Sequence, residues 1–330
     1  MEEKIDILMA TYNGEKYIKE QIDSILNQTY SNFRLLICDD NSTDNTYEII
    51  KEYEDKDDRI VVLKNETNLG YTKNFEKLLK NVENKFFMFS DQDDVWYKDK
   101  VELTLKKLKD DDSDFVFTDL EIVDENLQTK SPSFNRKMGY INKIIKCSNS
   151  YEMLYLYNVI TGCTILSKSK FIEKILPLPQ NKNLIHDHFI PLVIKLNGGK
   201  ISYLDVPTIK YRQHNNNQVG TSRYTAKLCS FKEVRDHLID VKISIFSEYI
   251  NCERLFINNN ELIKYNNKCL EYFKSLKKIK LISLKGIGMY FSIYKHEKLS
   301  YKLLYMFIFH FPIICKLGYG ISKLFINKKR

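Results

Sequence analysis

The stretch FFMFSDQDDVW, from Phe86 to Trp96, changes abruptly from apolar residues to acidic ones. Its apolar half predicts a buried strand, and Asp91, Asp93 and Asp94 follow where this strand ends. Carboxylates so close together repel one another unless a positive group lies between them. Mg²⁺ or Mn²⁺ takes oxygen ligands of this kind and commonly bridges a protein carboxylate to a phosphate. The stretch therefore predicts a cation site that holds an anionic ligand, and the alternative is an acidic turn without a metal.

Strand-like and helix-like segments alternate on both sides of this stretch. The pattern predicts strands at Ile5–Ala10, Phe33–Asp39, Ile60–Lys64, Phe86–Ser90 and Phe115–Asp119. It predicts helices at Tyr17–Asn27, Asp44–Tyr53, Lys73–Lys80 and Lys98–Lys109. This repeated order predicts an α/β fold with a mostly parallel, twisted, Rossmann-like sheet flanked by helices. Ligands of such sheets bind at the carboxyl ends of the strands.

The pattern changes past residue 120. The polar stretch Asn126–Lys143 predicts a surface loop, whereas His188–Leu196 reads as a helix and Lys200–Tyr211 as another strand. Further on, only helical periodicity remains. We therefore expect an α/β domain over residues 1–220 and a helical region over residues 221–330.

The 330-residue chain carries a net charge of +8, with acids concentrated in its first third and bases towards its end. The terminal segment, Leu281–Arg330, mixes apolar and aromatic residues with lysines. Its longest apolar run is shorter than the roughly 20 residues that span a bilayer. This composition favours contact with an anionic membrane surface, and the alternative is a packed helical region with solvated lysines. We expect no nucleic-acid partner.

Seven cysteines are scattered along the chain without a C-x-x-C pair, which indicates neither a zinc site nor a disulfide framework. The N-terminus, MEEKIDILMA, has no signal-peptide core. We therefore expect a cytoplasmic protein that is peripheral on the inner face of the cell membrane.

Two earlier strand ends also carry polar groups. In MATYNG, Thr11, Tyr12 and Asn13 offer a hydroxyl, a ring and an amide that suit a heterocyclic base, and the alternative is a plain turn before a helix. In CDDNSTDN, Cys38–Asn45, one carboxylate can accept the N3 hydrogen of uracil or thymine. The other carboxylate can bond a backbone amide or a ribose hydroxyl, and the alternative is a helix-capping turn.

Because each of these loops follows a strand, they share one edge of a parallel sheet, where base, ribose and diphosphate-metal functions line up. The segments ILMATYNGEKYIKEQIDSILNQTY, LLICDDNSTDNT, NLGYTKNF and FSDQDDVWYKDK resemble the family two inverting glycosyltransferases of the A-type nucleotide-sugar fold. The resemblance covers roughly Ile5–Gly220. SDQDDVW and the later YRQHNNNQVGT are most similar to bacterial rhamnosyltransferases of capsule and cell-wall polysaccharide assembly.

Taken position by position, the resemblance implies that Ala10 and Tyr12 lie against the donor base. It implies that Asp40 pairs with the pyrimidine ring and that Asp91 touches the ribose or the sugar. Asp93 is implied to bind the metal, Mg²⁺ or Mn²⁺.

Later positions complete this set. Lys73 falls near where some relatives place a basic group toward the diphosphate. HDHF corresponds to the segment that holds the general base, so Asp187 is the candidate for taking the proton of the acceptor hydroxyl, and the alternative is an N-capping aspartate. His186 stands where many relatives have an acid, and its role is open, as is that of Asp94.

The stretch YRQH adds two residues to the candidate site. Arg212 can hold a diphosphate, and His214 can reach the metal or the phosphate. The alternative is a polar loop without such contacts.

The resemblance implies a metal-dependent, inverting transfer of a sugar, with rhamnose favoured. The donor would be a pyrimidine nucleotide-diphosphate sugar and the acceptor a lipid-linked glycan of bacterial surface polysaccharide synthesis. A UDP-hexose transferase of the same fold and a non-catalytic nucleotide-sugar-binding subunit remain alternatives. Processive synthases of the family carry Q-x-x-R-W, which the single tryptophan, Trp96, excludes. A phosphatase with a D-x-D nucleophile is disfavoured because the motif follows the fourth strand and not the first.

Overall fold

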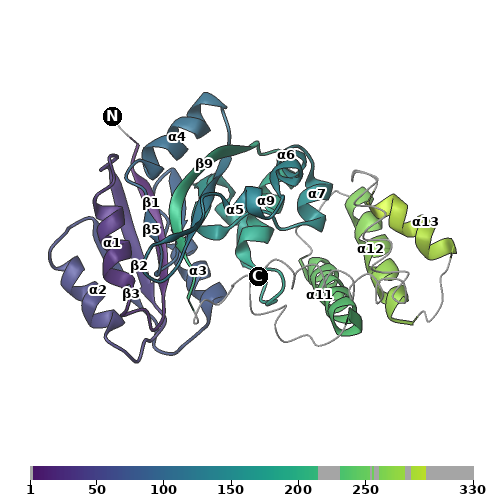
Figure 1. The fold of residues 1–330 in the computed structure, drawn as a ribbon, viewed down its shortest axis with the longest axis horizontal. Coiled ribbons are helices and arrows are strands. Elements are labelled where there is room, and N and C mark those ends of the chain that lie inside the picture. The colour runs from purple at the N-terminus through teal and green to yellow at the C-terminus, as the bar shows by residue number, and fades with distance from the viewer. Residues whose placement is uncertain (1–2, 215–230, 253–254, 256–259, 279–283, 295–330) are drawn as a thin grey trace, which may run out of the picture. The chain divides into compact units, whose positions relative to one another are not determined.

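The computed structural model describes residues 3–214, 231–252, 255, 260–278 and 284–294. The chain forms two compact units, residues 1–180 with 185–217 and residues 181–184 with 218–330. Over the described residues, the first unit holds one mixed sheet with helices packed against it (Figure 1). The expected α/β fold is confirmed for this unit.

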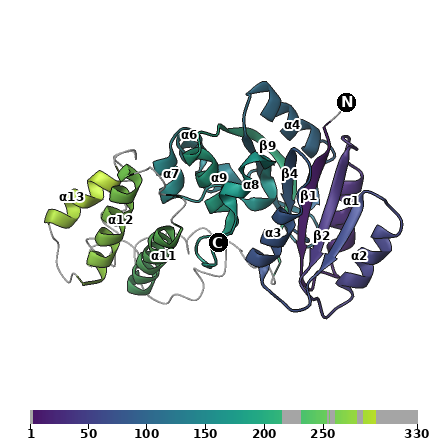
Figure 2. The same ribbon diagram turned by 180° about the vertical axis from the view of Figure 1, so that it is seen from behind.

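Four parallel strands form the first half of the sheet. They are β1 (Ile5–Thr11), β2 (Phe33–Asp39), β3 (Ile60–Lys64) and β4 (Phe86–Ser90). Their order is β3-β2-β1-β4, and Figure 2 shows β2, β1 and β4 side by side. Every residue of β4 is buried, as an apolar run without alternation predicts for a strand that is covered on both faces. The predicted positions of all four strands are confirmed.

A helix follows each of these strands: α1 (Ile18–Leu26), α2 (Thr46–Glu54), α3 (Tyr71–Lys80) and α4 (Lys100–Asp110). These helices agree with the predicted ones, with small shifts at their ends. Isoleucines at helical spacing on α1 are buried in the same cluster as the side chains of β1 and β2. The short strand β5 (Val95–Trp96) lies between β4 and α4 in the chain.

The second half of the sheet is mixed. Strand β8 (Ile165–Lys168) pairs antiparallel with both β4 and β6 (Phe115–Val123). Strand β9 (Ile201–Arg212) runs parallel to β6 and antiparallel to β5. The first half of the sheet is therefore parallel, as predicted, whereas in the second half β6 and β9 pair in parallel and the other pairs are antiparallel.

The predicted surface loop over Asn126–Lys143 is wrong in part. Strand β7 (Thr129–Ser131) pairs with β6, and the short helix α5 (Phe134–Lys137) follows it. The remaining helices of this unit are α6 (Ile141–Asn149), α7 (Tyr151–Leu156), α8 (Ile172–Ile175) and α9 (His186–Leu196), with 3₁₀ turns at Gly162–Thr164 and Ser169–Phe171.

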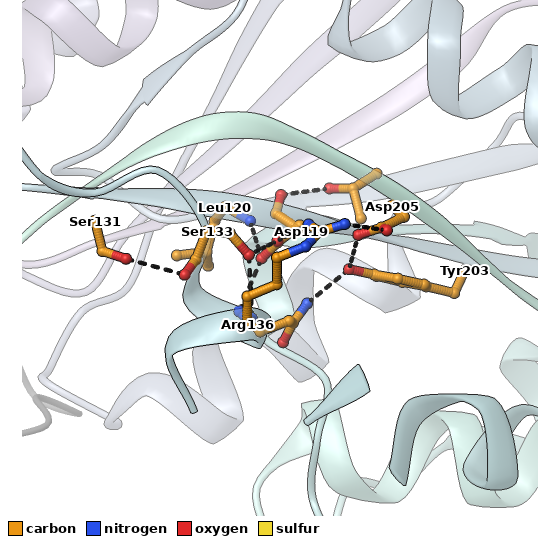
Figure 3. A network of polar contacts seen from close by, with 9 residues as sticks. Asp119, Leu120, Ser131, Ser133, Arg136, Tyr203 and Asp205 are labelled. Atoms are coloured by element: carbon orange, nitrogen blue, oxygen red, sulfur yellow. Dashed lines mark hydrogen bonds and ion pairs between the residues drawn. The ribbon is translucent and has the colours of Figure 1, made fainter. Parts of the chain in front are cut away.

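One buried carboxylate explains why this polar segment is ordered (Figure 3). Asp119, on β6, is fully buried, and it accepts hydrogen bonds from the Ser133 hydroxyl and from the backbone N–H of Asn135, at 3.1 Å. The Nη1 atom of Arg136 lies 3.9 Å from the same carboxylate, and its Nη2 atom bonds Asp205 of β9. Donors that are scattered in the sequence therefore converge on one charge.

Past residue 230, the described residues of the second unit are mainly helical. Its helices are α11 (Phe231–Asn251), α12 (Asn260–Lys278) and α13 (Leu284–Ile293). Tyr272 of α12 packs near Tyr290 of α13, with 6.1 Å between ring centroids. None of the helices that the structure describes has the length and apolar character that a bilayer span requires. Most of the segment predicted to contact a membrane, Leu281–Arg330, lies outside the described residues.

Asp119 and Asp205 both form ion pairs with Arg136. We expect them to differ greatly in what they contribute to the free energy of unfolding. Asp119→Ala leaves the donors of Ser133 and Asn135 buried without an acceptor, so we expect it to lower the free energy of unfolding by about 2–4 kcal/mol. Asp205→Ala removes a partner whose side chain is 45% exposed, and we expect a loss of less than about 1 kcal/mol. Urea titrations of the two variants make the comparison. Equal losses would contradict the central position of Asp119.

Candidate functional site

The carboxyl ends of β1, β2 and β4 meet at one edge of the sheet. In the parallel register, Thr11 lies opposite Asp39, and Met9 lies opposite Ser90. The loops that follow these three strands are therefore neighbours, as expected from the topology.

Side chains of the second loop hold the backbone of the first. The N–H of Asn13 donates to the Ser42 hydroxyl at 3.0 Å, and the Asn13 side-chain oxygen accepts from the Thr43 N–H at 2.8 Å. The N–H of Gly14 donates to the Thr46 hydroxyl at 2.7 Å. Asn13 has a φ of 47°, a left-handed conformation that asparagine tolerates better than most residues. The polar residues of both loops therefore fix the loops to one another.

Gln92, which the sequence interpretation did not single out, fixes the third loop to the first. Its Oε1 accepts from the N–H of Tyr12 at 2.9 Å, and its Nε2 donates to the Tyr12 carbonyl at 3.0 Å. Gly14 makes this approach possible, because a Cβ there would lie 2.4 Å from the Gln92 Oε1. The Tyr12 side chain, 39% exposed, is left accessible at the edge of the sheet.

Asp40 is buried at the end of β2 and already has protein partners. It accepts from the Asn65 side chain at 2.7 Å and from the N–H groups of Leu69 and Gly70 at 2.9 and 2.8 Å. A carboxylate offers about four lone-pair sites, so a further donor can still bind. Its pairing with a pyrimidine stays a prediction.

Other predicted contacts at this edge also stay predictions. Ala10 is half-buried at the end of β1, and the Thr11 hydroxyl donates to Asp39 at 3.2 Å. Lys73 is exposed on the first turn of α3.

The structure brings together the two residues that were expected to bind a metal. The Nε2 atom of His214, just past β9, lies 2.8 Å from the Oδ2 atom of Asp93, and their side chains are 9% and 17% exposed. The ring of Tyr17 packs against the imidazole, with 4.9 Å between centroids. A carboxylate beside an imidazole fits Mn²⁺, and Mg²⁺ through the carboxylate.

Arg212 differs from its expected role as a diphosphate ligand. It is 2% exposed, its Nε donates to the Asp93 carbonyl at 2.9 Å, and its Nη1 donates to the Glu125 carbonyl at 2.6 Å. Its Nη2 bonds Glu20 of α1. The guanidinium thus connects the aspartate loop to α1 and to the end of β6, which argues against a contact with diphosphate.

A second acidic cluster lies beneath the loop. Ligand atoms of Asp91, Asp94 and Cys163 come within 4.8 Å of one another. Burial and the charge of Asp93 raise the pKa of Asp91 to about 7 and that of Asp94 well above its usual range. A buried thiol suits a hard cation poorly, so we favour Asp93 and His214 as the metal pair.

One hydrogen bond and one nearby charge give Asp94 a supporting role. Its Oδ1 accepts from the N–H of Arg212 at 3.0 Å, which ties the aspartate loop to β9. Lys100, fully buried, adds a nearby positive charge and donates to the Cys163 carbonyl at 3.1 Å. Burial lowers the pKa of Lys100 to about 8.

Asp187 is the second residue of α9 and is 8% exposed. Its Oδ1 accepts from the side-chain amide of Asn158 at 2.7 Å. Burial raises the pKa of Asp187 to about 7, the Asn158 bond acts against this, and the charge of Asp91 adds to it. Burial lowers the pKa of the neighbouring His186 to about 4, and its ring packs against those of Phe75 and Phe89, which also contact each other.

Comparison with known proteins agrees with this architecture. The profile described as glycosyl transferase family 2 matches residues 6–173. The chain belongs to this glycosyltransferase family. A dTDP-rhamnosyl transferase, RfbG, of Shigella flexneri is 34% identical over 227 residues, which are 65% of this chain and 74% of RfbG. The glucosyltransferase WfgD of Escherichia coli is 35% identical over 142 residues, 43% of this chain and 55% of WfgD.

Solved structures show that this family 2 chain has the glycosyltransferase A-type fold. S. aureus TarS 1–349 in complex with UDP-GlcNAc has a TM-score of 0.55 at 20% identity and covers 90% of this chain and 77% of its own. The mannosyltransferase PcManGT of Pyrobaculum calidifontis, in complex with GDP-Man and Mn²⁺, has a TM-score of 0.54 at 13% identity. The match covers 92% of this chain and 79% of PcManGT.

The Gln92 contact predicts that substitutions of Gln92 and Gly14 have non-additive effects on hydrogen exchange of the Tyr12 amide. Gln92→Ala removes the acceptor of the Tyr12 N–H, and Gly14→Ala displaces the Gln92 side chain, so each should speed hydrogen exchange of the Tyr12 amide about tenfold. The double variant should exchange no faster than Gln92→Ala alone. The amide of Asn13, bonded to Ser42, is the internal control and should change little. Additive effects would mean that Gly14 does not act through Gln92.

Proposed function

We propose that this glycosyltransferase is an inverting, metal-dependent enzyme of bacterial surface polysaccharide synthesis. It would move a sugar, with rhamnose favoured, from a pyrimidine nucleotide-diphosphate donor to a lipid-linked glycan. The observation that carries the proposal is the position of the 3₁₀ turn Gly162–Thr164. A Cβ on Gly162 would lie 3.7 Å from the Asp187 Cβ, and the Cys163 sulfur lies within 4.8 Å of a carboxylate oxygen of Asp91. This turn supports a common site for the buried Asp187 carboxylate and the loop expected to contact the donor.

The chemistry follows from these residues. The carboxylate of Asp187 takes the proton of the acceptor hydroxyl while that oxygen attacks the anomeric carbon, opposite the departing diphosphate. Such a base typically contributes roughly 10²- to 10⁴-fold in rate. Asp93 and His214 would hold Mg²⁺ or Mn²⁺, which when bound offsets the charge that develops on the leaving diphosphate. Gln92 keeps Tyr12 in place beside the donor base.

The similarity to RfbG, named as a dTDP-rhamnosyl transferase, favours rhamnose. WfgD is named as a UDP-glucose transferase that acts on a GlcNAc-diphosphoundecaprenol, which keeps a UDP-hexose as the alternative donor and supports a lipid-linked acceptor. Such an acceptor agrees with a location on the inner face of the cell membrane, in contact with anionic lipid through residues 281–330. A non-catalytic donor-binding subunit would bind the nucleotide sugar without acceptor-dependent release of nucleotide.

Replacement of the proposed base should lower the rate of transfer without lowering the stability of the fold. Asp187→Asn should lower transfer by at least about 10²-fold and leave donor affinity unchanged. The folded-state pKa, about 7, lies above the ordinary value of 3.8, so ionising this buried group costs stability as the pH rises from about 4 to above 7. The variant should therefore unfold at an equal or higher temperature than the wild type at pH 8, and this difference should shrink at pH 5.

The exposed Asp205→Asn is the matched control and should leave both activity and melting temperature nearly unchanged. Normal transfer by Asp187→Asn would show that the base lies elsewhere.

Substitution of the two proposed metal ligands, Asp93 and His214, tests whether transfer depends on a metal. Asp93→Ala and His214→Ala should each raise the Mn²⁺ concentration for half-maximal activity at least about tenfold, because each removes one ligand. Chelation should abolish wild-type transfer. His237→Ala, on α11 of the second unit, is the control and should behave as wild type. Full activity in the presence of a chelator would contradict metal dependence.

A further inference from the structure

Asn158, which follows α7, makes an oriented contact with Asp187. Its Nδ2 donates to the Asp187 Oδ1 at 2.7 Å, while its own Oδ1 accepts from the N–H of Ile160 at 3.2 Å. Because the amide oxygen is used by a backbone donor, the amide NH₂ must face the carboxylate. The side chain therefore cannot turn over without losing both bonds.

The groups around Asp187 differ in their effect on its charge. Burial and the charge of Asp91 favour the neutral acid, whereas the Asn158 amide and the backbone N–H groups of Gly162 and His188 favour the carboxylate. The neighbouring His186 is neutral near pH 7, so it supplies no positive charge. The His188 ring is bonded to the carbonyl of Leu154 at 2.8 Å. Among the described residues, the groups that favour the carboxylate form of Asp187 are therefore hydrogen-bond donors.

Because Asn158 lies at the surface, its bond to Asp187 contributes little to the packing of the core. Asn158 is exposed, whereas Asp187 just beneath it is buried. Loss of an exposed amide costs a fold little, because water can satisfy the groups that it leaves. The bond therefore matters for the carboxylate more than for the stability of α7 or α9.

We infer that Asn158 is a positioning residue that fixes one oxygen of Asp187 and keeps this proposed base in its carboxylate form. The inference rests on the proposed role of Asp187 and names a residue that controls it. Asn158 need not touch either substrate, since it acts through the group that accepts the proton.

The test is the pH dependence of kcat/KM, which reports the ionisation of groups in the free enzyme. A net hydrogen bond of about 0.5–1.5 kcal/mol corresponds to about half to one pH unit, so Asn158→Ala should move the acidic limb up by that amount. Asn158→Asp places a second carboxyl group against Asp187 and should move the limb further up. Part of the activity that Asn158→Ala loses at pH 6.5 should return at pH 8.5.

Asn149→Ala is the matched control, because Asn149 is also exposed and its amide also donates at 2.9 Å, to the Ile145 carbonyl. It should keep the wild-type profile, and all three variants should keep the wild-type melting temperature within about 2 °C. Unshifted limbs in both Asn158 variants, with Asp187→Asn inactive, would overturn the role of Asn158 alone. Retained transfer in Asp187→Asn would overturn the proposed base together with this inference.

Discussion

The parallel pairing of β1 with β2 and β4 is the constraint on which the rest of the site depends. It brings the carboxyl ends of three strands, separated by up to 80 residues in the chain, to one edge of the sheet. Backbone groups at strand ends lack ladder partners, and here side chains of the neighbouring loops supply them. Gln92 and Ser42 each bond a backbone N–H of the first loop, so the three loops form one surface.

Buried charge is the second feature that the site depends on. Asp91, Asp94 and Asp187 all have a raised pKa, and burial is the main cause for each. Such an arrangement destabilises the free protein near neutral pH, and it persists because positive groups and donors surround it. Lys100 and Arg212 supply two of these from beneath and beside the loop. A cation or a hydrogen-bond donor that binds at this edge favours the ionised form of these carboxyl groups.

Much of the first unit could be predicted from local pattern. The apolar runs of β1 to β4 and the isoleucine spacing of α1 are local signals, and the strand ends then specify where Asp93 and Tyr12 lie. The insertion of β8 between β4 and β6 is different, because its antiparallel pairing depends on contacts distant in sequence. The polar stretch after β6 looked like a loop because its order depends on Asp119, a residue outside it. Arg212 has the chemistry of a phosphate ligand, and only its burial assigns it to the scaffold. Gln92 and Asn158 have no sequence signal beyond their residue type, since their partners are 80 and 29 residues away.

The central claim is that these strand-end loops form a site for a pyrimidine nucleotide-diphosphate sugar. The most direct measurement is the unfolding temperature of the protein with dTDP-rhamnose, UDP-glucose and GDP-mannose, each with and without Mn²⁺. A ligand that binds only the folded state raises the free energy of unfolding by mass action, by about 2.7 kcal/mol at a hundred times its Kd, and so raises this temperature. We expect stabilisation by a pyrimidine donor that is larger with Mn²⁺. Stabilisation by the purine donor alone, or by none of the three, would contradict it.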